Sequence, residues 1–83
     1  MKLVKVIWYD TNETSDSGWV SLEEAKDNKP CKVASVGWLV NENSNTTVVM
    51  ADFSFEDNGD IKQGGNYTTI PTKNVLTIKK IKI

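Results

Sequence analysis

The chain has 83 residues, of which 39% are hydrophobic and 25% are charged, and its formal net charge is −1. A chain of this length can bury one small core, so we expect residues 1–83 to form a single small domain. The nearly balanced charge argues against a general nucleic-acid binder. The sequence has no His, no Arg and one Cys, which excludes an internal disulfide and the common zinc and iron–sulfur ligand sets.

The first predicted element is a strand over residues 3–9. Its alternation places three apolar side chains on one face, namely Val4, Val6 and Trp8. Lys5 and Asp10 interrupt the apolar run, so it is not the apolar region of a signal peptide, and no segment approaches the roughly 18 apolar residues of a membrane span. We therefore expect a cytoplasmic protein without a membrane partner.

Residues 10–27 form an acidic segment with six carboxylates and one Lys, whereas the chain from Lys73 onward carries four Lys and no acid. Ser21 and Glu24 have the spacing of a capping box, which predicts a short helix starting at this serine. Pro30 limits its length because the residue before a proline disfavours the helical conformation. The terminal Lys residues indicate either a protected edge strand or a basic anion-binding face.

Strands are predicted for most of the remaining chain. Val, Ile and Thr total 23 residues against four Leu and three Ala, which favours β structure. Residues 32–41 and 46–55 are predicted to form a hairpin. Two further strands are expected at 67–70 and 75–83, with a flexible point at Gly64-Gly65 and a break at Pro71. The expected fold is mainly β: a small curled antiparallel sheet or SH3-like barrel of about five strands, with one short helix after the first strand.

Catalysis is not expected. Without His, the chain lacks the side chain whose ordinary pKa lies near neutral pH, and Cys31 has no His to activate it. Asp57 and Asp60 flank a turn but do not follow the spacing of a calcium loop. We expect a binding protein with no cofactor and no metal.

Two tryptophans directly follow a glycine, in Gly18-Trp19 and Gly37-Trp38. A glycine beside a large ring allows the backbone to approach a flat ligand that stacks on that ring, as in nucleobase recognition. The alternative is that both rings belong to the core and that Gly37 marks a β-bulge. The sequence leaves both interpretations open.

The chain resembles a group of small uncharacterised phage proteins. The resemblance is carried by short motifs along most of the chain: Trp8 and Asp10, Ser17-x-Trp19 before a helix near Glu23, Ser35-Val36-Gly37-Trp38-Leu39-Val40, and Ile70-Pro71 before an apolar last strand. Some phage proteins of this size resemble cyclic-nucleotide sponges, such as the anti-CBASS sponges, which sequester a defence signal in the host cytoplasm. This resemblance implies capture of a cyclic nucleotide without cleavage.

Such a ligand needs aromatic stacking, donors for phosphate and polar groups for base edges. Candidate ligand-binding residues of these types are Tyr9, Ser17, Gly18, Trp19, Ser35, Gly37, Asn41, Thr68, Thr69 and Lys73. Without Arg, Lys would meet phosphate as a point charge. A symmetric cyclic dinucleotide suits a site shared between protomers, so a homo-oligomer is expected.

Two other functions remain open from the sequence. The first is a small phage adaptor or inhibitor that binds a host protein through its surface, using the acidic segment of residues 10–27. The second is a single-stranded nucleic-acid binder, which the lack of positive net charge disfavours.

Overall fold

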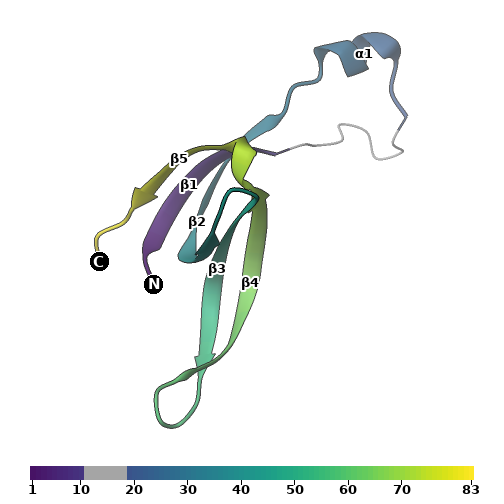
Figure 1. Ribbon diagram of the computed structural model, residues 1–83. Coiled ribbons are helices and arrows are strands. Elements are labelled where there is room, and N and C mark those ends of the chain that lie inside the picture. The colour runs from purple at the N-terminus through teal and green to yellow at the C-terminus, as the bar shows by residue number, and fades with distance from the viewer. Residues whose placement is uncertain (11–18) are drawn as a thin grey trace.

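The computed structural model describes residues 1–10 and 19–83, and its strands form one antiparallel sheet in the order β4-β3-β2-β1-β5 (Figure 1). The elements in chain order are β1 Leu3–Asp10, α1 Leu22–Asp27, β2 Cys31–Glu42, β3 Thr46–Phe55, β4 Ile61–Pro71, the 3-10 turn η1 Thr72–Asn74, and β5 Val75–Lys80. The predicted curled antiparallel sheet with one short helix after its first strand is confirmed. The sheet curls without closing, and β4 and β5 are its two edges.

Residues 61–66 of β4 differ from the prediction, which placed a strand only at 67–70. Gly64 and Gly65 are paired with Phe53 and Asp52 of β3. Pairing with this strand therefore holds the two glycines in the extended conformation, which they do not favour on their own. The side chain of Met50 occupies the space that a Cβ atom at Gly64 would need. Glycine here permits close packing. At the other edge, β5 ends at Lys80, earlier than the predicted residue 83.

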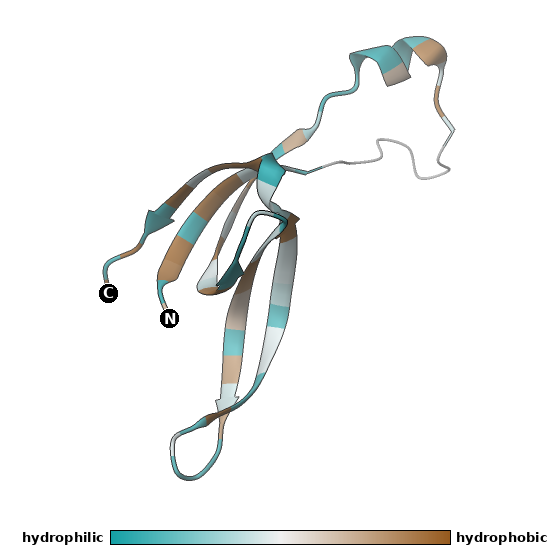
Figure 2. Cartoon of the chain, viewed as in Figure 1, coloured by the Kyte–Doolittle hydropathy of each residue, from teal (hydrophilic) through white to brown (hydrophobic). Residues whose placement is uncertain are grey.

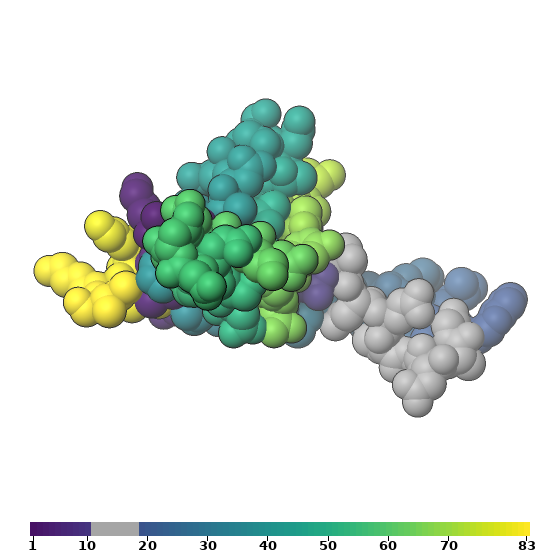
Figure 3. Space-filling model, turned by 90° about the horizontal axis from the view of Figure 1, so that it is seen from below, coloured from purple at the N-terminus to yellow at the C-terminus, as the bar shows by residue number. Residues whose placement is uncertain are grey.

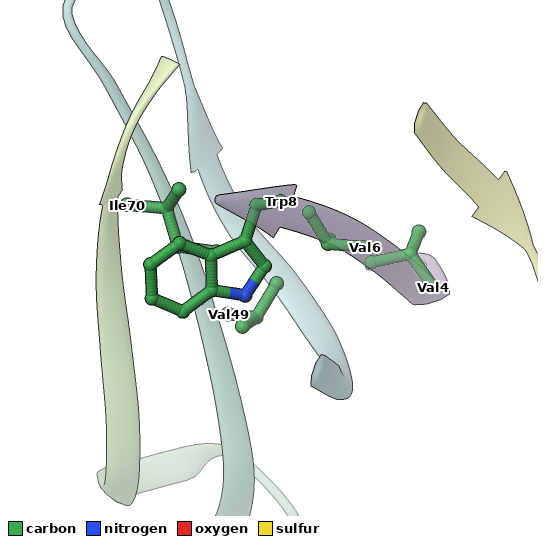
Figure 4. Close-up of a cluster of buried hydrophobic side chains, with 5 residues drawn as sticks. All are labelled: Val4, Val6, Trp8, Val49 and Ile70. Atoms are coloured by element: carbon green, nitrogen blue, oxygen red, sulfur yellow. The ribbon is translucent and has the colours of Figure 1, made fainter. Parts of the chain in front are cut away.

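The core lies on the inner face of the curled sheet. Its five buried apolar residues are Val4, Val6, Trp8, Val49 and Ile70, which confirms the predicted inward face of β1. Figure 4 shows the Trp8 ring between Val49 and Ile70. The ring nitrogen Nε1 of Trp8 donates a hydrogen bond to Ser35 Oγ at 3.0 Å, so the polar atom of this large ring is satisfied.

Gly37 of β2 allows the sheet to bend over this core. It is buried and paired with Val4, and a Cβ atom at this position would lie 2.9 Å from the carbonyl oxygen of Met50. The register of β2 and β3 shifts between Leu39 and Asn41, so the bulge lies after Gly37. The missing side chain therefore lets the β3 backbone approach β2 closely.

Two parts of the chain extend away from the core. The molecule measures 57 × 26 × 23 Å, and its radius of gyration is 16.4 Å, against about 12 Å for a compact chain of this length. The segment with α1 extends from one end of the sheet, as Figures 1 and 3 show, and the β3–β4 hairpin extends from the other end (Figure 1). In the described part of the chain, no helix is long and apolar enough to cross a membrane.

Candidate binding site on the outer face of the sheet

The structure distributes the predicted ligand-binding residues over several parts of the molecule. Tyr9 is 41% exposed at the end of β1, and Lys73 is exposed in η1. Asn41 and Thr69 lie in one row because both pair with Val48, one from each side. Trp19 is 86% exposed beside α1. Ser17 and Gly18 lie outside the described residues.

Three other predicted residues, Ser35, Gly37 and Thr68, face the core. Ser35 accepts the hydrogen bond from Trp8, and Gly37 lies beneath the backbone of β3. Thr68 is half-buried and shares its face with the buried Ile70 two positions later. The structure thus gives the first two residues structural partners and does not bring the eight described positions of the predicted set into one pocket.

A row of apolar side chains crosses the outer face of the sheet. Leu3 pairs with Trp38, which pairs with Met50, which pairs with Tyr67. The row continues past β5, since the Ile81 backbone nitrogen donates to the Leu3 carbonyl oxygen at 2.8 Å. Directly paired residues share a face of a sheet, so these five side chains, here called the outer row, lie side by side.

A pocket of about 330 Å³, here called the end pocket, lies at one end of the outer row. Its lining residues are Met1, Lys2, Leu3, Trp38, Lys80, Ile81, Lys82 and Ile83. Backbone hydrogen bonds from Leu39 to Lys2 and from Ile81 to Leu3, both 2.8 Å long, hold the three chain segments together. The pocket is therefore lined by three Lys residues, one Trp and four other apolar residues.

This combination suits a planar ligand that carries negative charge. The half-buried Trp38 can provide a stacking surface, and the exposed Lys side chains provide three donors each to phosphate or carboxylate oxygens. The volume is at the lower end of the roughly 300–1,000 Å³ of small-molecule pockets. The volume of the end pocket suits one nucleotide unit better than a complete cyclic dinucleotide.

No sequence pattern directly indicates that Lys2 belongs with Lys80 and Lys82. The terminal Lys residues were consistent with an anion-binding face, and residues 78–83 consist only of Ile and Lys. The missing information was the pairing of Val4 with Lys80, which joins the two ends of the chain. This register brings residues 80–83 to the end of β1 at which Leu3 pairs with Trp38.

The position of Trp38, open from the sequence, is now defined. The ring is half-buried and lines the end pocket, so it belongs neither to the buried core nor to the predicted set of site residues. In comparisons with known proteins, no family model, curated protein or solved structure matches the chain.

Proposed function

We propose that the protein is a non-enzymatic binding protein that captures a cyclic nucleotide in the end pocket. The observation that carries this proposal is that Trp38 lines the same pocket as Lys2, Lys80 and Lys82. Base stacking on an aromatic side chain contributes about 1–3 kcal/mol. Hydrogen bonds between ammonium groups and phosphate are charge-assisted and stronger than neutral ones.

The ligand is held without being cleaved. The sequence offers no His for proton transfer near neutral pH, and the end pocket contains only Lys and apolar side chains. Taken with the resemblance to phage sponges, this favours immune evasion in the host cytoplasm by sequestration of a defence signal. A cyclic dinucleotide would leave its second nucleotide for the end pocket of another protomer, which gives the shared site that a symmetric ligand favours.

Titration calorimetry with a panel of cyclic di- and trinucleotides tests this function. At least one member should bind with a Kd below about 10 μM, without added metal, and be released intact on heating. Trp38→Ala and Lys80→Gln should each weaken binding by roughly tenfold or more, because they remove a stacking surface and a charged donor. Lys62→Gln is the matched control, since this Lys lies on β4 and does not line the pocket.

The opposite pattern would place the ligand elsewhere. If Lys73→Gln abolished binding and Lys80→Gln had no effect, the ligand would lie near η1, where the sequence predicted a phosphate contact. If no member of the panel bound at 10 μM, roughly −6.8 kcal/mol, the nucleotide-binding function would be wrong.

The second candidate function is that of an adaptor or inhibitor that binds a host protein. The observation in its favour is that Trp19 and Leu22 are 86% and 79% exposed beside the carboxylates of α1. Large exposed apolar side chains rimmed by charge are typical of protein-interaction surfaces. This function requires no small-molecule ligand.

A further inference from the structure

The segment of residues 19–30, here called the arm, presents apolar side chains that its own chain leaves exposed. No residue of α1 is buried, and the exposed fractions of Trp19, Leu22 and Val20 are 86%, 79% and 40%. Figure 2 shows isolated hydrophobic positions on this otherwise mostly hydrophilic segment, away from the sheet. Ser21 caps α1 by accepting a hydrogen bond from the Glu24 backbone nitrogen at 3.1 Å, so the apolar residues flank a defined helical turn.

The charges of the arm complement those of the end pocket. Glu23, Glu24 and Asp27 line one hollow on α1, and residues 10–27 contain a single Lys, at position 26. The end pocket is lined by Lys2, Lys80 and Lys82 together with apolar residues. The arm therefore combines apolar and acidic residues, whereas the end pocket combines apolar and basic residues.

These two surfaces lie too far apart to meet within one molecule as it is folded. The arm joins the sheet at Cys31, which is paired with Asp10, whereas the end pocket begins at Leu3, about 23 Å away along β1. Figure 1 shows α1 beyond that end of β1, with both chain termini at the other side of the sheet. A contact between arm and pocket must therefore join two molecules.

We propose that the arm of one copy docks into the end pocket of a second copy. Leu22 and Trp19 pack against the apolar residues of the pocket, and the carboxylates of α1 face Lys80 and Lys82. The contact joins two different surfaces, so it is made reciprocally by two copies, closes into a ring or extends as an open filament. It does not depend on nucleotide binding, but a nucleotide that uses the same Lys side chains displaces the arm.

Charge exchange tests the contact directly. The arm variant is Glu23→Lys with Asp27→Lys, which leaves Ser21 and Glu24 of the cap in place, and the pocket variant is Lys80→Glu with Lys82→Glu. The native chain should show a mass that rises with concentration above the 9.3 kDa of one copy in sedimentation and light-scattering measurements. Each variant alone should remain at one copy, and an equimolar mixture should associate again because the reversed arm fits the reversed pocket.

Two further variants separate docking from general effects of charge and folding. Lys62→Glu with Lys73→Glu changes the net charge by the same amount outside the pocket and should associate like the native chain. Leu22→Ser keeps the charge and should weaken association about 10–100-fold, since Leu22 is exposed in one copy and buried in the complex. Circular dichroism confirms that each variant retains its sheet.

Three results would overturn the proposal. The first is that the native chain keeps the mass of one copy at every concentration, even if it captures a different host protein. The second is that the charge variants associate like the native chain. The third is that the mixture of folded variants keeps the mass of one copy. Nucleotide binding is measured separately by calorimetry, so failure of the proposed ligand would leave association unchanged. Loss of association would likewise leave nucleotide affinity measurable.

Discussion

Gly37 is a residue at which a single added carbon would meet the backbone of the neighbouring strand. The space for its Cβ atom is taken by the backbone of Met50, whose carbonyl oxygen and carbon lie 2.9 and 3.2 Å from that position. Backbone in a paired strand cannot move aside as easily as the end of a flexible side chain. Accommodating a methyl group at this position must push β3 away from the core residues beside it.

Gly37→Ala should therefore lower the free energy of unfolding by about 1–3 kcal/mol, the usual cost of overpacking a filled interior. Urea denaturation followed by circular dichroism measures this change. Gly65→Ala is the matched control, because it also lies in a strand and has no atom within 4 Å of its Cβ position. Equal destabilisation by both substitutions would show that the contact with Met50 is unimportant.

Among the elements, η1 is connected to the β2–β3 turn by a short polar network. Thr72 Oγ1 donates to the Asn43 carbonyl oxygen at 2.8 Å and lies 3.0 Å from Thr47 Oγ1. The single hydroxyl proton of Thr72 is used on Asn43, so Thr47 must be the donor in the second bond. Thr47 is fully buried, and an unpaired hydroxyl in the interior is costly. The bond to Thr72 removes this cost.

Thr72→Val should lower the free energy of unfolding by about 1–3 kcal/mol, because it leaves the buried Thr47 hydroxyl unpaired. The double variant Thr47→Val with Thr72→Val should cost less than the sum of the two single changes, since both partners become apolar. Thermal or urea unfolding of the four proteins gives this difference. Thr77→Val, at an exposed position on β5, should stay within about 0.5 kcal/mol of the native chain. Strict additivity would contradict a bond between the two hydroxyls.

The elements that local chemistry determines were predictable. The helix begins after Ser21 and ends at Asp27, and the hairpin strands lie within one residue of their predicted bounds, because capping, turn and alternation signals act over a few residues. The extent of β4 was not predictable, since Gly64 and Gly65 are ordered by β3 and not by their own preferences. The end pocket was missed for the same reason: its residues become neighbours only when β1 pairs with both β2 and β5.

On the scale of the whole molecule, stability is expected to decrease along its length. The pairing of β2 with β3 ends at Trp38 and Met50, so residues 51–55 and 61–65 form a ribbon of only two strands. Phe55 and Ile61 near its tip are 62% and 48% exposed. Two-stranded ribbons are marginally stable alone, and this ribbon is anchored only where it joins the core.

Hydrogen exchange followed by NMR should show this gradient. The amides of Val6 and Val49 should exchange only on global unfolding, whereas those of Ser54 and Gln63 should exchange at least about tenfold faster through local opening. Low denaturant should accelerate exchange at Val6 and leave exchange at Ser54 nearly unchanged. Uniform protection over all four amides would mean that the ribbon opens only with the core.

The pairing of Val4 with Lys80 also sets an order of events during folding. The hairpins of β2, β3 and β4 join near neighbours in sequence and can form early, whereas β1 and β5 meet across almost the entire chain, which is entropically slow. The end pocket cannot exist before this last strand docks. A ligand in the pocket therefore binds only molecules in which β5 has docked, and it stabilises the docked strand. Binding and folding are thus thermodynamically coupled.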